Sequence, residues 1–234
     1  MKQFEWQKLG PLDVLCRPSQ ELQKESKAVI LLHGYGADAS DLASLSQYWD
    51  PEGVHSWYFP DGFVTTSFGG KAWFEIDYRA LEQALAAGQS FDFSERTPPG
   101  LSMAHEMVSQ SLVEIVGQHE TYILGGFSQG SMVTVDVMLG SALSPERMIL
   151  LSGAPIDLAR WRTLDFRNPE QKFFQCHGRM DQVIDISKGK KLNEFLLSKN
   201  AKGPFEPFDG GHEIPLGILD KLKPMIMGNR KQSR

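Results

Sequence analysis

The sequence has few cysteines, no excess of positive charge and no long apolar run. Its 234 residues include only two cysteines, Cys16 and Cys176, too few for a disulfide framework and too far apart for a Cys-x-x-Cys metal site. Lys and Arg number 24 against 29 Asp and Glu, so the net charge of −5 gives no broad basic field for a nucleic-acid backbone. No stretch approaches the roughly 18 uncharged apolar residues that a membrane span needs. We therefore expect no nucleic-acid partner and no integral membrane segment.

The two ends of the chain are polar. The first residues mix Lys2, Glu5 and Lys8 with apolar side chains, whereas a secretory signal needs an unbroken apolar run of about 7 to 15 residues. This pattern predicts a cytoplasmic protein. The length suits a single domain over residues 1–234, with about residues 227–234 as a frayed basic tail.

Short apolar segments of strand character alternate with segments of helical periodicity. The strand-like segments are 28–32, 54–59, 122–124, 148–151, 172–176 and 205–208. Apolar stripes at helical spacing lie in 101–117, 129–139, around 192–196 and from Pro215 onward. The alternation predicts an α/β fold with a mostly parallel central sheet and helices on both faces. We expect no large cap domain.

Residues 60–100 form the least regular region and are rich in aromatic side chains among glycines and prolines. Long irregular excursions in compact domains often carry function. Two interpretations stay open: the aromatic residues pin the excursion to the core, or they line an apolar substrate slot. The set is Phe63, Phe68, Trp73, Phe74, Tyr78, Phe91 and Phe93.

A candidate nucleophile lies between a strand and a buried helix. The segment Gly126-Phe127-Ser128-Gln129-Gly130 matches G-x-S-x-G, a sharp turn that presents a serine hydroxyl above a sheet. The two glycines suit a turn with no room for Cβ atoms, and the helix N-terminus favours a developing oxyanion. We therefore predict that Ser128 is a nucleophile.

A nucleophilic serine needs a histidine base. In this fold the chain order is serine, acid, histidine, and of the six histidines only His177 and His212 follow Ser128. His212 lies on a loop after the last strand, where its side chain can reach over the strand ends. We favour His212 as the base and expect His177, directly at a strand end, to be a hydrogen-bonded structural residue.

The histidine needs an acid that orients its ring. Asp181 lies on the loop after the 172–176 strand, between Ser128 and His212 in the chain. We predict that Asp181 is this acid. The alternatives are Asp157, Asp185 and Asp209, which follow an earlier strand, enter a helix and lie almost beside the histidine, respectively.

Stabilising the oxyanion requires two backbone N–H groups. One is expected from Gln129, directly after the nucleophile, and the other from a loop that follows an earlier strand. The turn His33-Gly34-Tyr35-Gly36 ends the 28–32 strand, and its glycines allow the amide of Tyr35 to turn toward the serine. The competing interpretation is a glycine turn that only ends a buried strand.

Together these motifs resemble the phospholipase/carboxylesterase family of the α/β-hydrolase superfamily, which includes acyl-protein thioesterases. The resemblance rests on Leu31–Gly36, Trp73–Ile76, Leu124–Gly130, Leu151–Gly153, Cys176–Gly178 with Asp181, and Gly211-His212. It implies an α/β-hydrolase fold, a triad of Ser128, Asp181 and His212, and oxyanion donors at Tyr35 and Gln129. It further implies that Trp73 and Phe74 border the acyl slot and bind substrate.

These observations predict a serine hydrolase that cleaves carboxylic ester or thioester bonds through an acyl-enzyme. We expect it to use neither a cofactor nor a metal, and its partner to be a small-molecule ester or an acylated substrate. Acyl-protein thioesterase and lysophospholipase activities use the same residues, and a non-catalytic binding protein on a hydrolase fold is the alternative from another class. The sequence leaves open whether the chain forms a homodimer.

Overall fold

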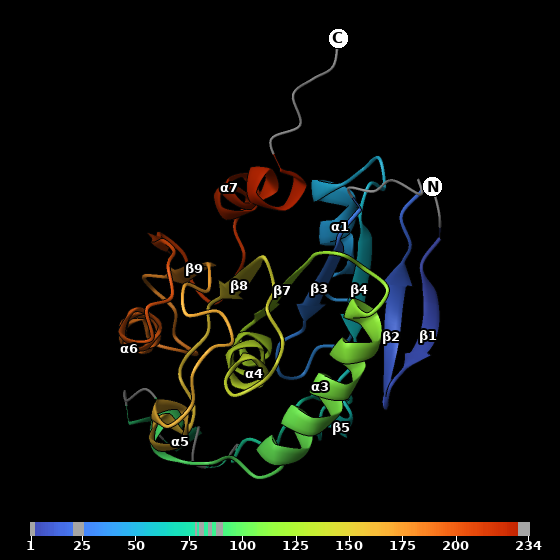
Figure 1. The fold of residues 1–234 in the computed structure, drawn as a ribbon. Coiled ribbons are helices and arrows are strands. Elements are labelled where there is room, and N and C mark those ends of the chain that lie inside the picture. The colour runs from blue at the N-terminus through green and yellow to red at the C-terminus, as the bar shows by residue number, and fades with distance from the viewer. Residues whose placement is uncertain are drawn as a thin grey trace.

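The computed structural model describes residues 3–20, 26–77, 79, 82–83, 86–87 and 91–228. An eight-stranded sheet crosses the molecule in the order β1-β2-β4-β3-β7-β8-β9-β10 (Figure 1). From β4 to β10 each strand is parallel to its neighbours in that order, whereas β1 and β2 pair antiparallel at one edge. The mostly parallel sheet is therefore confirmed. The strands are β1 (Glu5–Leu9), β2 (Leu12–Arg17), β3 (Ala28–Leu32), β4 (Ser56–Pro60), β7 (Tyr122–Phe127), β8 (Arg147–Leu151), β9 (Phe173–Gly178) and β10 (Phe205–Phe208).

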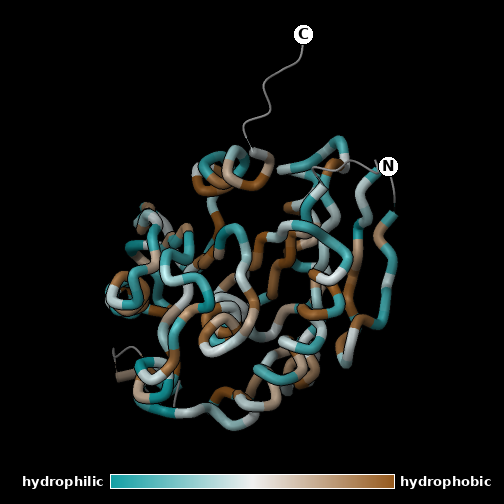
Figure 2. Tube along the Cα trace, in the orientation of Figure 1, coloured by the Kyte–Doolittle hydropathy of each residue, from teal (hydrophilic) through white to brown (hydrophobic). Residues whose placement is uncertain are grey.

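Helices cover both faces of the sheet, as predicted, because its central strands are apolar on both sides. In β3 all five residues are buried. Ile30 and Leu32 pack with one group of helices, and Val29 and Leu31 pack with the other. The first group is α3 (Leu101–Val116), α4 (Gln129–Met138), α5 (Leu158–Arg162) and α6 (Ile186–Ser198); the second is α1 (Ala43–Trp49) and α7 (Leu216–Met227). Figure 2 shows the apolar sheet interior between them.

The N-terminal hairpin of β1 and β2 was not predicted. Four of the five β1 residues are exposed, so the strand lacks the apolar run that marked the central strands. The predicted segments correspond to β3, β4, β7, β8, β9, β10, α3, α4, α6 and α7, whereas α1 and α5 were not predicted. In α7 the buried residues are Ile218, Leu219, Leu222 and Ile226.

The sheet changes direction of growth between β3 and β7. From β3 the chain continues outward to β4 on one side, and later strands are added from β7 to β10 on the other. In open α/β sheets ligands bind at such a switch point, beyond the carboxyl ends of the strands. The loops that follow β3 and β7 therefore meet at the natural location for a site. A small hairpin of β5 (Val64–Thr65) and β6 (Lys71–Ala72) lies against the first of these loops.

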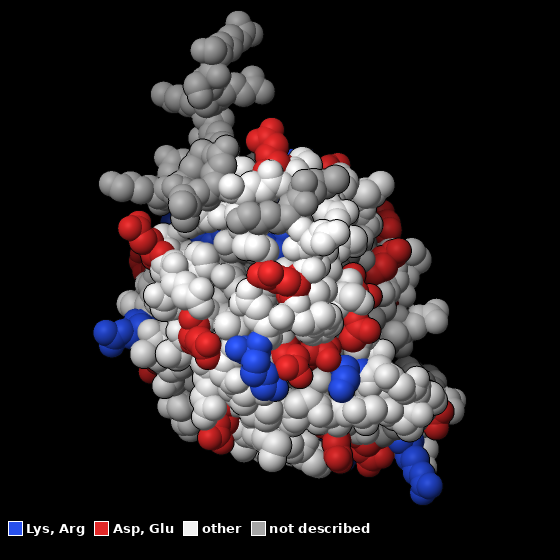
Figure 3. Space-filling view, turned by 90° about the vertical axis from the view of Figure 1, so that its right-hand side faces the viewer, with Lys and Arg blue, Asp and Glu red and all other residues white. Residues whose placement is uncertain are grey.

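The described surface is consistent with the composition. On the face shown in Figure 3, acidic side chains are scattered and basic side chains form no continuous patch. Within the described part of the chain, no helix has the length and apolar character needed to cross a membrane. Residues 229–234 of the predicted tail, and Tyr78 of the aromatic set, lie outside the described residues.

Candidate active site

The candidate nucleophile lies on a tight turn between β7 and α4. Ser128 precedes the first residue of α4 with φ 54° and ψ −116°, a backbone region that costs a non-glycine residue about 1–3 kcal/mol. Close backbone packing enforces the turn. A Cβ on Gly130 would lie 2.0 Å from the carbonyl oxygen of Leu32, and a Cβ on Gly126 would lie 2.4 Å from the carbonyl carbon of Gly130. Both glycines of the motif are therefore required for β3, β7 and α4 to meet.

The structure brings Ser128, His212 and Asp181 together. His212 Nε2 lies 2.9 Å from Ser128 Oγ, and His212 Nδ1 lies 2.7 Å from Asp181 Oδ2. An ionised carboxylate can only accept hydrogen bonds. Nδ1 therefore donates to Asp181, and Nε2 presents its lone pair to the hydroxyl of Ser128.

Asp181 is held in place by main-chain and imidazole donors. Its Oδ1 accepts from the N–H groups of Val183 at 2.9 Å and Ile184 at 2.8 Å. Burial alone raises the pKa of Asp181, but hydrogen bonds from His177 and His212 outweigh burial and hold the pKa well below its usual range. The carboxylate thus stays ionised beside His212 at neutral pH.

His177 does not contact Ser128. Its side chain is fully buried, and its Nε2–H donates to the carbonyl oxygen of Ile184 at 2.7 Å while lying 3.4 Å from Asp181 Oδ2. This is the hydrogen-bonded structural position that the sequence predicted. A Cβ on Gly189 would lie 2.5 Å from His177 Nδ1, so α6 packs directly on the ring. His177 therefore braces the loop that carries Asp181.

The three alternative acids are engaged elsewhere. Asp157 caps the N-terminus of α5 by accepting from the N–H of Arg160. Asp185 caps α6 by accepting from the N–H of Ser187. Asp209 is largely exposed and pairs with Arg179 at 3.2 Å.

The loop after β3 lies against the nucleophile. A Cβ on Gly34 would be 3.4 Å from Ser128 Cβ. The β5–β6 hairpin holds the loop from outside, because Gly36 N–H donates to the carbonyl oxygen of Lys71 and Lys71 N–H donates to that of Ala37. Beneath the loop, His33 Nε2 accepts from Gly62 N–H at 2.9 Å.

His33 is consequently a neutral anchor of this loop. Because its Nε2 accepts, its Nδ1 carries the proton and donates to the carbonyl oxygen of Gly34 at 2.7 Å. Burial lowers the pKa of His33, which keeps the ring uncharged at neutral pH. In the sequence, only the position of His33 at the start of the glycine turn indicates such a role.

Trp73 and Phe74, predicted to border an acyl slot, lie beneath the site and have no solvent exposure. Trp73 Nε1–H donates to the carbonyl oxygen of His33 at 2.8 Å. The side chain of Gln129 accepts from Trp73 N–H and donates to the carbonyl oxygen of Phe74, both at 2.9 Å. The prediction of direct substrate contact is therefore corrected: the two aromatic residues support the site from below.

A cavity of about 540 Å³ opens beside the hydroxyl of Ser128. The apolar side of this cavity was not predicted as a set, because its side chains come from segments that are distant in the sequence. That side comprises Ile76, Phe93, Phe127, Met132, Val183 and Ile184, and Tyr35, Gln129 and His212 also line the cavity. An apolar group bound in this cavity would lie next to the Ser128–His212 pair.

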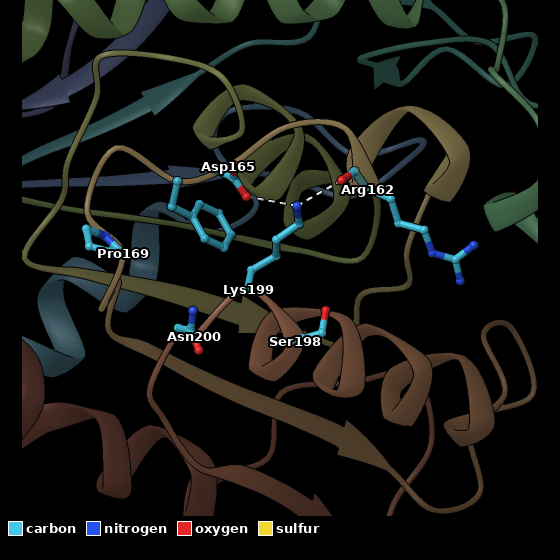
Figure 4. A pocket seen from close by; sticks show the side chains of 7 residues that line it. Arg162, Asp165, Pro169, Ser198, Lys199 and Asn200 are labelled. Carbon is cyan, nitrogen blue, oxygen red and sulfur yellow. Dashed lines mark hydrogen bonds and ion pairs between the residues drawn. The ribbon is translucent and has the colours of Figure 1, made fainter.

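Another hollow, of about 640 Å³, lies between the end of α6 and the segment after α5 (Figure 4). Its one lysine is engaged: Lys199 Nζ donates to the carbonyl oxygen of Arg162 and to Asp165 Oδ1, both at 2.9 Å. The hydroxyl of Ser198 donates to Phe195. No histidine or nucleophile–base pair is among its lining residues.

Both cysteines are buried thiols, and burial raises the pKa of each to about 12. Among the residues that the structure describes, no three His, Cys, Asp or Glu side chains cluster as metal ligands.

The parallel sheet, the strand–turn–helix at Ser128 and the acid and histidine on later loops define an α/β-hydrolase, the class that includes many serine esterases. The family model described as phospholipase/carboxylesterase matches residues 19–227. The chain belongs to this family and is an ester-bond hydrolase of the serine type.

Individual relatives agree with the family. The chain is 28% identical to acyl-protein thioesterase 1 of Eremothecium gossypii, covering 91% of this chain and 92% of that protein. It superposes on the carboxylesterase of Bacillus cereus with a TM-score of 0.72 at 16% identity, covering 92% and 93% of the two chains. It superposes on esterase PE8 with a TM-score of 0.73 at 24% identity, covering 92% and 96%. These structural similarities support the fold.

Proposed function

We propose that Ser128, His212 and Asp181 form the catalytic triad that cleaves carboxylic ester and thioester bonds. The observation that carries this proposal is the unbroken hydrogen-bonded series from Asp181 Oδ2 through the His212 ring to Ser128 Oγ, at 2.7 and 2.9 Å. These are distances at which proton transfer between nucleophile and base is direct. The series ends in a cavity that can hold the acyl group.

The reaction follows from this geometry. Ser128 Oγ attacks the acyl carbon while His212 Nε2 takes its proton, and Asp181 stabilises the imidazolium that forms. The tetrahedral intermediate collapses, and the leaving alcohol or thiol takes that proton from His212. A water molecule then attacks the acyl-enzyme and gives a proton to His212. As the bond between the acyl carbon and Ser128 Oγ breaks, His212 returns this proton to Oγ and the acid leaves.

Backbone amides of Gln129 and Tyr35 are the proposed oxyanion donors. Gln129 opens α4, where the first N–H groups of a helix point along its axis toward the site. Tyr35 lines the cavity on the loop that touches Ser128. The anchoring of that loop by His33 and the β5–β6 hairpin supports this assignment, because a preorganised donor needs a fixed main chain.

The substrate class follows from the cavity and the relatives. The apolar side of the cavity suits an acyl chain, and the name of the Eremothecium gossypii relative indicates an acylated protein as one source of it. A lysophospholipid or a small ester offers the same acyl chemistry. The cytoplasmic location and the single domain stay predictions of the sequence, which also allows a homodimer.

Substitution of the nucleophile tests the proposal. We expect Ser128→Ala to lower kcat for p-nitrophenyl and thioester substrates by about 10⁴-fold or more, to abolish labelling by a fluorophosphonate, and to keep the wild-type melting temperature. Turnover close to wild type in the variant contradicts the triad. A folded wild-type protein without turnover or labelling favours the non-catalytic binding protein.

A further inference from the structure

Two cavities meet at one phenylalanine. The cavity beside Ser128 and a second one, of about 240 Å³, share Phe93 and Ile76 as lining residues. None of the triad residues lines the second cavity, whose other lining residues are Glu75, Asp77, Phe91, Arg96, Thr97, Pro98 and Pro99. Because Phe93 and Ile76 border both cavities, a group bound covalently to Ser128 meets these two side chains on the way into the second cavity.

Phe93 is the larger of the two barriers. Its side chain is 7% exposed and belongs to the main apolar core. The ring of Phe91 packs against it edge-on, with centroids 4.8 Å apart, from the side of the second cavity. Phe93 thus borders both cavities, whereas Phe91 lies behind it and lines the second cavity alone.

Residues 91–97, which we name the strap, are fixed to α6 by charge. Asp92 Oδ2 accepts from Lys188 Nζ at 2.7 Å, and Lys191 Nζ donates to Ser94 Oγ at 2.6 Å. Asp92 also caps the short helix η1 (Phe93–Glu95) by accepting from the N–H of Ser94. Phe93 therefore follows a residue that is held on two sides.

The other end of the strap is fixed to α5. Thr97 Oγ1 donates to Asp157 Oδ2 at 2.5 Å, and the N–H of Asp157 donates to the carbonyl oxygen of Phe93 itself at 3.3 Å. Arg160 of α5 in turn pairs with Asp136, a fully buried carboxylate of α4. The helix that begins after Ser128 and the strap that carries Phe93 thus share one polar network.

We propose that Phe93 determines the length of the acyl group that the enzyme accepts, by closing the cavity beside Ser128 against the second cavity. The inference rests on the proposed function and names its specificity residue. An acyl chain that fits the first cavity binds with its end against the Phe93 ring, and a longer chain is hindered there. Beyond Phe93 the second cavity is apolar at Phe91, Pro98 and Pro99 and polar at Glu75, Asp77, Arg96 and Thr97. Removing the barrier therefore gives a longer chain further apolar surface on one side of that cavity.

The first test compares kcat/KM for p-nitrophenyl esters from about four to about sixteen carbons. For Phe93→Ala we expect the preferred chain to lengthen by several carbons and the ratio of long-chain to short-chain kcat/KM to rise about tenfold, because each newly buried methylene adds binding energy. Phe93→Leu, a milder truncation, should shift the preference in the same direction and serves if the alanine variant does not fold. Phe91→Ala is the matched control, because it enlarges the second cavity but keeps the barrier and should leave the preferred length unchanged.

The second test separates the barrier from catalysis. In the Ser128→Ala background, carboxylic acids of the same lengths compete with a fluorescent fatty acid for binding, with and without Phe93→Leu. If Phe93→Leu lengthens the preferred acid, the result supports Phe93 as the barrier. This holds even if the wild type hydrolyses none of the esters, because a lack of hydrolysis overturns only the proposed function. Serine-dependent hydrolysis with the same chain-length profile in wild type and the folded Phe93 variants overturns the barrier and leaves the proposed function standing.

Discussion

The cavity beside Ser128 has two walls that are built in different ways. On the nucleophile side, residues 126–130 are fixed by main chain against main chain, so closely that a Cβ on Gly130 would meet the carbonyl of Leu32 at 2.0 Å. On the side of Phe93, the strap is fixed to α5 and α6 mainly by side chains of Asp92, Ser94 and Thr97. A backbone contact tolerates no added atom, whereas side-chain contacts can be exchanged one at a time. The backbone contacts therefore hold the wall at Ser128 rigidly. The wall that meets the acyl chain can be altered by substituting single side chains.

The largest expected loss of stability comes from adding one methyl group to the backbone wall. Gly130→Ala places its Cβ against main-chain atoms of both Leu32 and His33, which cannot move without breaking the β3–α4 packing. We expect the free energy of unfolding to fall by about 4 kcal/mol, measured by urea unfolding.

The control for this prediction is the same substitution where there is room. A Cβ on Gly217, within α7, meets no atom within 4 Å, and alanine in a helix is favoured over glycine by about 0.5–1 kcal/mol. Gly217→Ala should therefore be neutral or slightly stabilising. Equal effects at the two glycines contradict the backbone-contact account.

An intermediate loss of stability is expected at Gln129, which joins the turn of Ser128 to the loop that carries Trp73. Gln129 is 1% exposed, and its side chain holds the N–H of Trp73 and the carbonyl of Phe74. Gln129→Met keeps the volume and removes both hydrogen bonds, so two buried backbone groups lose their partners. We expect a loss of about 2 kcal/mol in the free energy of unfolding.

The functional readout sharpens this prediction. The backbone N–H of residue 129 is retained in the variant, so labelling of Ser128 by a fluorophosphonate should persist while KM for esters rises. Unchanged stability in Gln129→Met would show that packing of Trp73 and Phe74, rather than these hydrogen bonds, holds the loop.

The backbone wall could be predicted from the sequence and the side-chain wall could not. Gly126, Ser128 and Gly130 lie at fixed spacing between a strand and a helix, and the order of acid and histidine is set by the sheet topology. The position of Asp181 and His212 on loops after successive strands follows from the same local pattern.

The strap depends instead on contacts between residues about a hundred positions apart, such as Asp92 with Lys188. The periodicity of a local segment cannot predict such a pair. For the same reason the aromatic residues of 60–100 could not be divided in advance: Trp73 and Phe74 are buried supports, whereas Phe93 reaches the cavity. The hairpin of β1 and β2 was missed because an exposed edge strand needs no apolar pattern.

The smallest expected effect comes from the charge that holds the strap. Asp92→Asn removes the ion pairs with Lys188 and Lys191, at 2.7 and 3.5 Å, while an amide oxygen can still cap η1. Because Asp92 and both lysines are partly exposed, we expect a loss of only about 1 kcal/mol in the free energy of unfolding at neutral pH. The loss should shrink in high salt, which screens exposed pairs.

The dependence of this stability loss on pH shows whether the charge of Asp92 or the packing of its side chain holds the strap. Burial acts to raise the pKa of Asp92, but hydrogen bonds from Lys188 and Ser94 outweigh it and hold the pKa well below the ordinary 3.8. A carboxyl whose pKa is lower in the folded than in the unfolded state stabilises the fold above its ordinary pKa, and this contribution is lost as the pH falls through the folded value. The stability difference between wild type and Asp92→Asn should therefore be constant from about pH 7 to about pH 5 and decrease below 3.8. If the stability difference between wild type and Asp92→Asn stays the same below pH 3.8, packing rather than charge holds the strap. The strap would then be as rigid as the backbone wall around Ser128.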